Sequence, residues 1–492
     1  MKKNKISQFF TIFFLLIALS SCSFSDFVSD FNQKYHEYTS SGEGYFHTDT
    51  GNSIELIDNA FNSKMDINNQ NLLGDFSGNT SSSDASRLFI TKNVTDLEYN
   101  IGMTPSTGKV KGLVIPVDFV DYPISNIQYA DNPLPAYQSV SSYYYNSSYG
   151  ALDIEFDVLD WYRLSHSSSY YKNLSNKTYA GEVPGVSAII HEVLKSIDDQ
   201  IDFNEYDSNH DGFIDCLHIL YSHPIDRIDA DFWWAYQYYN LNEIYYDGVL
   251  PYAYVFASFN FLFEDDENCN ARTYIHETGH LFGLEDYYDY DSKKGFNKGG
   301  LGGYDMMDAT IGEHNPFSKI SLGWIKNPVL LDLSENYNLT LTIESYEKNG
   351  DTILVPKGSF NKEKGMFQSY YLIQLLNPQS RLLKNEYNRI NKLGIRIFEV
   401  NAELATFQDG ESSYVYYQND NSYSSINLIN AINKDRLDYY YYPNEYESFC
   451  ASNYNLFFEN DSLTFSNTTI KMTVSKIDST NLNATLTFKR FL

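Results

Sequence analysis

Cysteine is scarce in this chain of 492 residues: four are present, and no two of them have CxxC spacing. The sequence therefore does not support a cysteine zinc site. Cys22 belongs to the N-terminal region, which leaves Cys216, Cys269 and Cys450 for the folded part of the chain. An odd number of cysteines in an oxidising compartment predicts at most one disulfide and one free thiol, with the pairing undetermined.

Basic residues are also few. There are 35 Lys and Arg against 64 Asp and Glu, for a formal net charge of -29. Such a charge repels phosphate backbones and anionic membrane surfaces, so nucleic acid is excluded as an expected partner. Tryptophan is rare, with 4 residues against 44 Tyr and 33 Phe, and this composition favours β-rich packing over a sugar-binding platform. The length and the 42% of hydrophobic residues predict two or three folded units.

The N-terminal apolar run, residues 9–19 (FFTIFFLLIAL), is too short to span a bilayer as a stable helix. Lys2, Lys3 and Lys5 precede it, which is typical of a secretory signal. The following LSSC resembles a bacterial lipobox, in which Cys22 would become the lipid-modified first residue; a plain signal peptide with a chance cysteine is the alternative. We therefore expect residues 1–22 to be a lipoprotein signal peptide. The protein would then be an extracellular, cell-surface lipoprotein that contacts the bacterial membrane only through its lipid anchor.

Residues 23–100 are predicted to form a polar tether or pro-segment. Their first part is rich in Ser, Asn, Asp and Gly, as in SGNTSSSDASR, and has little apolar periodicity. No cysteine-switch motif is present, so position and composition are the only indications of a pro-segment.

An ordered domain is expected to begin near residue 101 and to extend to residue 330. Val, Ile and Leu in residues 110–124 predict a buried strand, and residues 152–158 alternate as a second strand. Residues 184–197 have helical apolar spacing behind a proline. Residues 331–492 contain alternating stretches such as NLTLTIES, SYYLIQLL and TIKMTVSKI. The predicted fold class is α+β: a catalytic domain with a mixed sheet and an active-site helix, then a C-terminal β-sandwich-like domain.

The stretch IHETGHLFGLED, residues 275–286, has the spacing of a metal site. On a helix, side chains four residues apart share one face, so His276 and His280 converge. Glu277 stands where a general base can reach a water molecule, and Gly283 is expected to end the helix in the left-handed conformation and turn the chain. Asp286 would then supply a third ligand and leave one position of a tetrahedral zinc open, as a catalytic site requires.

Two neighbouring carboxylates and a methionine-containing loop belong to the same prediction. Glu285 and Asp289 compete with Asp286 for the role of third ligand. Residues 302–308 (GGYDMMD) match a methionine turn beneath the metal, with Met307 preferred as its floor residue. In the EHNPF segment that follows, a role lining the cleft and a role in the core or a turn both remain open.

These motifs resemble the immune inhibitor A family of secreted bacterial zinc metalloproteases, which is metzincin-like. HExxHxxGxxD, the glycine-rich methionine segment and an LGW tripeptide appear here as IHETGHLFGLEDYYDY, GGYDMMDATIGEHNPFSK and SLGWI. TGKVKGLVIPVDFVDYP and SSYYYNSSYGALDIEFDV are also similar to segments of that family. The resemblance covers roughly residues 105–490 and is strongest at 276–324. It implies a zinc metalloendopeptidase with Glu277 as the catalytic residue.

A second set of candidate metal ligands lies in DSNHDGFID, residues 207–215. Asp207, Asn209, Asp211 and Asp215 offer oxygen atoms, and Gly212 stands where a calcium loop turns sharply. His218 occupies the place of the bidentate glutamate, and the following CLHILYS favours a strand, so an EF-hand is excluded. A calcium loop with fewer ligands and an Asx-rich turn that caps backbone groups remain as alternatives.

We therefore expect a secreted or surface-anchored, monomeric enzyme that uses Zn²⁺, with Ca²⁺ as a second candidate ion, to hydrolyse peptide bonds of extracellular proteins. Two other functions remain open: a catalytically inactive surface adhesin or binding lipoprotein, and a zinc hydrolase that acts on a non-peptide substrate. Intact Glu277 speaks against the adhesin, because an inactive protein has no use for the base.

Overall fold

The structure is a computed structural model. It describes residues 102–126, 133–175, 183–226, 232–262, 271–287, 301, 305–309, 312–326, 328–331, 336–380, 390–406, 412–415, 427–432 and 453–490. The predictions for residues 1–100, including Cys22, lie outside these ranges, as do Cys269, Asp289 and Cys450. Within the described ranges, no helix has the length and apolarity needed to cross a membrane. The mixture of helices and several separate sheets makes the fold α+β, as predicted.

The described residues form two compact units. The first comprises residues 102–142 and 153–282, and the second comprises residues 143–152 and 283–490. In this division the second unit includes residues 283 onward, and the domain boundary at residue 330 stays a prediction. Within the second unit, residues 312–326 bond to the segment 143–149: the Tyr143 hydroxyl donates to the Gly312 carbonyl at 3.1 Å, and Lys319 donates to the Tyr149 hydroxyl at 2.9 Å.

The first unit is built on a six-stranded sheet with the order β2-β1-β4-β6-β5, in which β3 pairs with β1. The strands are β1 (Gly108–Asp118), β2 (Leu152–Val158), β3 (Tyr162–Arg163), β4 (Leu217–Tyr221), β5 (Tyr236–Tyr239) and β6 (Ala253–Ser258). The helices are α4 (Leu134–Ser147), which begins in this unit, α5 (Ser168–Ser175), α6 (Pro184–Ile197) and α7 (Arg272–Leu281), with 3-10 turns η4 (Ile124–Asn126), η5 (Phe203–Tyr206) and η6 (Phe259–Leu262).

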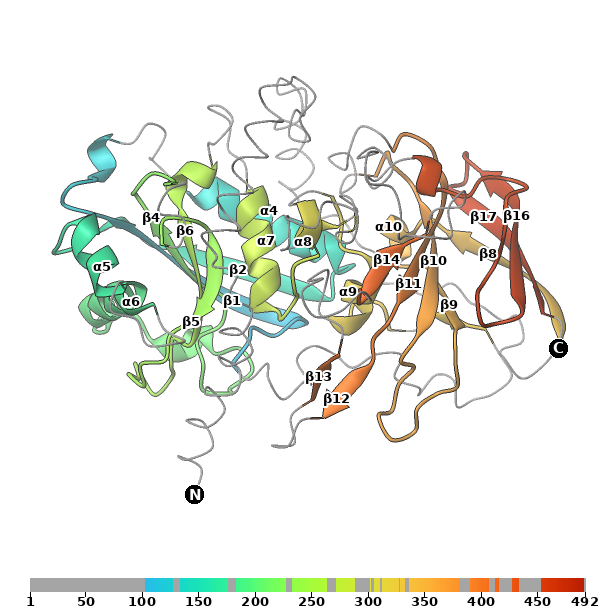
Figure 1. Ribbon diagram of the computed structural model, residues 1–492. Helices are drawn as coiled ribbons and strands as arrows, with labels where there is room; N and C mark the ends of the chain where they lie inside the picture. Colours follow the sequence, from blue (N-terminus) through green and yellow to red (C-terminus); the bar gives the residue numbers. More distant parts are fainter. Residues whose placement is uncertain are drawn as a thin grey trace. The chain divides into compact units, whose positions relative to one another are not determined.

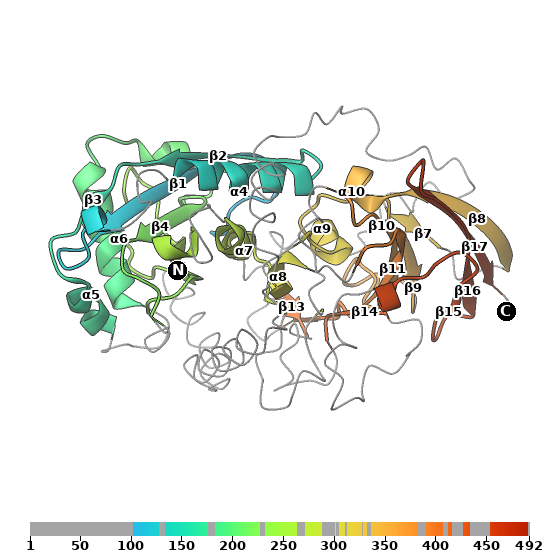
Figure 2. The same cartoon turned by 90° about the horizontal axis from the view of Figure 1, so that it is seen from above.

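Helices cover both faces of this sheet. Strands β4 and β6 pair in parallel and are buried along their whole length, as parallel strands between two helical layers are. Leu113, Ile115 and Val117 of β1 share a core with the apolar stripe of α6, which confirms the predicted helix. His218 of β4 points to the other face, where α7 lies (Figure 2).

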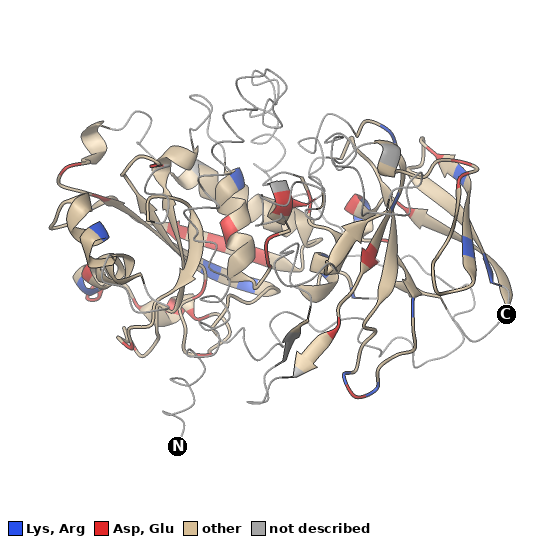
Figure 3. Cartoon of the chain, viewed as in Figure 1, with Lys and Arg blue, Asp and Glu red and all other residues tan. Residues whose placement is uncertain are grey.

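At the β1–β2 edge of the sheet, the basic side chains belong to β1 and most of the acidic ones to β2. Acidic residues Asp153, Glu155 and Asp157 lie on β2, and the lysines of β1 lie nearby (Figure 3). The Lys111 ammonium is 3.1 Å from the Asp157 carboxylate, and the two side chains are partly exposed, at 33% and 42%. Such an exposed pair contributes less than about 1 kcal/mol to stability.

The second unit contains two larger sheets and a two-stranded ribbon (Figure 1). The first sheet has the order β14-β11-β10-β9-β7, with β7 (Val329–Leu330), β9 (Ile353–Pro356), β10 (Tyr370–Leu376), β11 (Gly394–Val400) and β14 (Ile429–Ala431). The second has the order β15-β16-β17-β8, with β8 (Tyr337–Glu344), β15 (Ser462–Thr464), β16 (Ile470–Asp478) and β17 (Asn483–Arg490). The ribbon is β12 (Leu404–Thr406) with β13 (Ser412–Tyr414), and the short helices are α8 (Met306–Ala309), α9 (Pro316–Ser321), α10 (Tyr346–Asn349) and η9 (Asn453–Asn455).

The two larger sheets share one apolar core. Ile373 and Ile397 of the first sheet and Met472 and Leu486 of the second belong to the same buried cluster, as in a β-sandwich. The other face of β10 and β11 is also buried, because α10 packs against it: the Arg396 guanidinium donates to the Tyr346 hydroxyl at 3.2 Å. This second covering explains why β10 is buried along its whole length and β11 at every residue except the half-buried Glu399.

Candidate metal centre

Helix α7 carries the HExxH sequence and is fixed to the sheet along one face. The Tyr274 hydroxyl donates to the Ser258 carbonyl at 2.8 Å, and the Thr278 hydroxyl lies 3.4 Å from Nε2 of His218. Tyr274 and Thr278 are four residues apart and therefore lie on the same face of the helix. His276 and His280 are each two residues further along, about 200° around the axis, and so lie on the face turned away from the sheet.

The predicted turn after α7 is confirmed. The last helical residue is Leu281, and the C-cap Phe282 donates its N–H to the Gly279 carbonyl at 3.1 Å. Gly283 then has φ of +84°, the left-handed conformation that a glycine adopts at little cost. The chain changes direction here, and Asp286 follows three residues later.

The structure brings His276, His280 and Asp286 together. One ligand atom of each, an imidazole nitrogen or a carboxylate oxygen, lies within 4.8 Å of those of the other two. The two imidazole rings are perpendicular, with centroids 4.9 Å apart. His276 and Asp286 are buried and His280 is half-buried. Within the described residues, no other group of three His, Cys, Asp or Glu side chains has this spacing.

The donor set fits a zinc ion. Ligand atoms on a tetrahedral zinc lie about 3.4 Å from one another, given bonds of about 2.1 Å, so the three side chains, whose ligand atoms lie within 4.8 Å of one another, would close in on a bound ion. Two imidazoles and one carboxylate make up the protein ligand set of a catalytic zinc site. Glu277, the residue after the first histidine, is buried in α7.

The neighbouring residues have different surroundings. Glu285, a predicted competitor of Asp286, is exposed and is not among the three residues whose ligand atoms converge. Met306 and Met307 begin α8, and both side chains are almost completely buried. The preference for Met307 over Met306 stays a prediction.

In the EHNPF segment, the structure favours the core and turn roles over a role in the cleft. Asn315 is the N-cap of α9, and its side-chain oxygen accepts the Ser318 N–H at 3.0 Å. The fully buried His314 ring lies among aromatic rings, stacked on Tyr144 and edge-on to Trp324.

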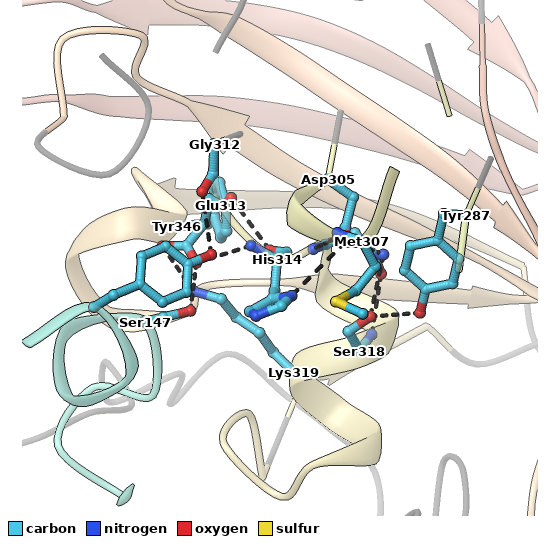
Figure 4. A network of polar contacts seen from close by, with 12 residues as sticks. Ser147, Tyr287, Asp305, Met307, Gly312, Glu313, His314, Ser318, Lys319 and Tyr346 are labelled. Atoms are coloured by element: carbon cyan, nitrogen blue, oxygen red, sulfur yellow. Dashed lines mark hydrogen bonds and ion pairs between the residues drawn. The ribbon is translucent and has the colours of Figure 1, made fainter. Parts of the chain in front are cut away.

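The first residue of this segment, Glu313, forms a buried ion pair with Lys319 (Figure 4). Lys319 and Glu313 are fully buried, with the ammonium 3.3 Å from a carboxylate oxygen. The Lys319 ammonium also lies 4.3 Å from the centre of the Tyr149 ring, and Glu313 accepts hydrogen bonds from the Ser147 hydroxyl and the His314 N–H. The pair was not predicted from the sequence, although its two members stand only six residues apart, because residues at this spacing meet only when the chain between them turns.

The contacts of the candidate calcium loop are those of an Asx-rich turn. Both oxygens of Asp207 accept backbone N–H groups, from Asp211 and Gly212, each at 3.0 Å. Asp215 accepts the Ser208 N–H at 2.7 Å, and Asn209 accepts the Asp211 N–H at 3.2 Å. Burial raises the pKa of Asp215 to about 7. A calcium loop with fewer ligands, the other alternative, is left to a binding experiment.

Two further polar residues of the first unit, Cys216 and Glu192, have defined surroundings. Cys216 is a buried free thiol, and burial raises its pKa well above the usual value. In the His191–Glu192 pair of α6, which has no histidine four residues after the first, Glu192 is half-buried and accepts hydrogen bonds from the Ser165 N–H and the Tyr171 hydroxyl. This glutamate has a structural role.

Two residues near the centre were not predicted. His218 is fully buried behind α7, between Tyr137 and Thr278, and Asp305 is fully buried beside Met307. Asp305 lies within the methionine segment. An aspartate just before a tight turn indicates a side chain that accepts backbone N–H groups of the turn, so this role could have been predicted from the sequence. His218 has no such signal, because its partners come from two separate helices.

No protein-family model matches the chain, and no curated protein matches it either.

Proposed function

We propose that this protein is a zinc-dependent endopeptidase that hydrolyses peptide bonds of extracellular proteins. The observation that carries the proposal is the convergence of His276, His280 and Asp286 beside Glu277, on a helix fixed to the sheet by its opposite face. In this proposal the two imidazoles and the Asp286 carboxylate hold the ion. When bound, zinc supplies Lewis acidity that polarises a carbonyl group and lowers the pKa of a water molecule to about 7.

Glu277 is the proposed catalytic residue. Its carboxylate takes a proton from the attacking water molecule, and the water oxygen forms a bond to the peptide carbonyl carbon. Glu277 then gives this proton to the nitrogen of the leaving amine as the carbon–nitrogen bond breaks. The products are one carboxylic acid and one amine, and Glu277 returns to its initial state.

The sheet of the first unit favours a peptide over a glycan substrate. Among the described strands, β5 pairs only with β6, so it forms an edge of the sheet, and it lies beside α7. An edge strand offers unpaired backbone N–H and C=O groups to an extended peptide. A glycan has no backbone amides with which to pair in this way.

The proposal also places the enzyme outside the cell, anchored through Cys22. The support for this part is the sequence of residues 1–22 alone. Mass spectrometry of the mature N-terminus tests it, because a lipid-modified Cys22 is expected there.

The central experiment compares two glutamine substitutions. We expect Glu277→Gln to keep its zinc content and to lose peptidase activity by about 10²- to 10⁴-fold, the usual contribution of a general base. Glu192→Gln is the matched control, since it makes the same change after a histidine on another helix of the same unit. It is expected to keep both zinc and activity. Substantial activity in Glu277→Gln would refute the proposed mechanism.

Zinc binding and peptidase activity also distinguish the third ligand from its neighbour and the proposed function from the two alternatives. Asp286→Asn should weaken zinc binding by at least about 100-fold, since even outer partners of ligands contribute 10- to 100-fold, while Glu285→Gln should not. Zinc-loaded protein that cleaves neither casein nor a peptide panel would indicate a binding protein. Cleavage of a glycan without cleavage of any peptide would indicate a different zinc hydrolase.

A further inference from the structure

We propose that Asp305 is a positioning residue for Asp286, the third ligand of the proposed zinc site. Asp305 is fully buried and acts through the backbone of Met307 and then of Tyr287, the residue directly after Asp286. This inference rests on the proposed function, and it concerns residues that the metal motif does not contain.

Asp305 holds the turn that contains Met307. One oxygen of its carboxylate accepts the Met307 N–H at 2.7 Å. The other accepts the backbone N–H of Asn315 and, at 2.8 Å, the side-chain amide of Asn315. A buried carboxylate that accepts several N–H groups is satisfied by these donors. The main chain of Met307 is therefore fixed relative to the start of α9.

Met307 in turn holds the residue after the ligand. The Tyr287 N–H donates to the Met307 carbonyl at 2.8 Å, and the Tyr287 hydroxyl lies 2.5 Å from Oγ of Ser318. Ser318 donates its own N–H to the side chain of Asn315. The contacts form a closed ring from Asp305 through Met307, Tyr287, Ser318 and Asn315 back to Asp305. Figure 4 shows Asp305, Met307, Tyr287 and Ser318 of this ring.

The ring fixes one end of the short segment that carries Asp286. Residues 284–287 have no regular secondary structure, and the left-handed Gly283 marks the other end of the segment. A metal ligand must be held within about 0.5 Å of its productive position. Asp286 is adjacent to Tyr287, so a loosened Tyr287 backbone would displace the carboxylate from the two imidazoles. Asp305 is the member of the ring that accepts the most hydrogen bonds.

The test is the zinc affinity of two matched variants, measured by competition with a chelator. Asp305→Asn places a donor NH₂ group against the N–H donors and so breaks the ring. Asp351→Asn is the control: Asp351 is also a buried aspartate of the second unit that accepts a backbone N–H, from Glu344 at 2.9 Å, but it lies on a different turn. We expect Asp305→Asn to bind zinc about 10- to 100-fold more weakly than the wild type, and Asp351→Asn within about twofold of it.

Melting temperatures in EDTA separate positioning from general destabilisation. If the two variants lose similar thermal stability without metal but only Asp305→Asn loses zinc affinity, the inference is supported. Tyr287→Phe is a milder second variant, because it removes the hydroxyl that contacts Ser318 and leaves the carboxylate of Asp305 in place; it should bind zinc more weakly than the wild type, by less than Asp305→Asn. It decides the question if Asp305→Asn fails to fold.

Three results would overturn the inference. The first is a folded Asp305→Asn variant that binds zinc as tightly as the wild type does. The second is an equal loss of zinc affinity in Asp305→Asn and Asp351→Asn. The third applies if Asp305→Asn does not fold, and it is a Tyr287→Phe variant with unchanged zinc affinity. Any of these leaves the proposed function intact, because the wild-type protein still binds zinc and is active. Conversely, wild-type protein that binds zinc without peptidase activity would refute the proposed function and leave the role of Asp305 standing. Wild-type protein that binds no zinc would refute both.

Discussion

His218 should make the first unit sensitive to acid. It is fully buried, with Nδ1 3.3 Å from the Tyr137 hydroxyl and Nε2 3.4 Å from the Thr278 hydroxyl. Thr278 donates its own proton to the Tyr274 carbonyl at 2.6 Å, so its oxygen is available to accept from Nε2–H, and Tyr137 then donates to Nδ1. A neutral imidazole satisfies both contacts. Burial lowers the pKa of His218 to about 3.

The size and sign of the effect follow from linkage. An unfolded histidine has a pKa of about 6.5, so between pH 6.5 and pH 3 the unfolded state binds the extra proton and stability falls as the pH falls. Each pH unit in this window costs about 1.4 kcal/mol. At pH 4.5, two units below 6.5, His218 should therefore lower the free energy of unfolding by about 2.7 kcal/mol relative to pH 7.5.

The assay is urea unfolding of the metal-free protein at pH 7.5 and 4.5, with and without His218→Gln. A Trp324→Phe background places all remaining tryptophans, Trp161, Trp233 and Trp234, in the first unit, so fluorescence reports that unit alone. The free energy of unfolding of the protein that keeps His218, minus that of the His218→Gln variant, should decrease by about 2.7 kcal/mol from pH 7.5 to pH 4.5. A change below about 0.7 kcal/mol, half a pH unit of linkage, would refute the reasoning.

Asp215→Asn is a control of opposite sign. Burial raises the pKa of Asp215 to about 7, above its unfolded value, so this carboxyl stabilises the fold at low pH and loses that contribution as the pH rises through 7. Relative to Asp215→Asn, the wild type should gain about 3 kcal/mol between pH 7.5 and pH 4.5. The two effects partly cancel in the wild type and become visible only in the single variants.

Two further predictions concern a buried charge pair and a metal. Lys319→Met leaves Glu313 buried with its charge uncompensated, which should cost about 3 kcal/mol, or about 6–12 °C of melting temperature by calorimetry. The double variant with Glu313→Gln should recover most of this loss, and a single variant as stable as the wild type would contradict the pairing. Because backbone N–H groups already bond to Asp207 and Asp215, millimolar calcium should leave the melting temperature of the metal-free protein unchanged. A saturable increase, about 2.7 kcal/mol at 100 times the dissociation constant, would instead show a calcium site.

Much of the fold could be predicted from local patterns. The spacing of apolar residues behind Pro184 predicts α6, and alternation over residues 338–345 and 469–477 predicts β8 and β16. These patterns succeed because the period of the side chains in a helix or a strand is fixed by backbone geometry. The same rule placed His276 and His280 on one face of α7, and the left-handed preference of glycine placed the turn at Gly283.

Local patterns did not reveal which residues support the centre. His218 was considered only for its position in a candidate calcium loop, yet it lies behind α7 because β4 and α7 pack face to face. The composition of residues 207–215 left a calcium loop and an Asx-rich turn equally open, and the direction of each side chain toward a backbone N–H was needed to tell their contacts apart.

The sequence by itself determined the elements whose causes lie within a few residues: the helix with two imidazoles on one face, the glycine turn after it, and the strands of the C-terminal region. Only the tertiary structure decided what surrounds them. Asp305 reaches Tyr287 through Met307, and Lys319 meets Glu313 and Tyr149 in one buried cluster. The physical reason is that hydrogen bonds between distant segments depend on how the elements pack, and the spacing of residues along the chain carries no information about that packing.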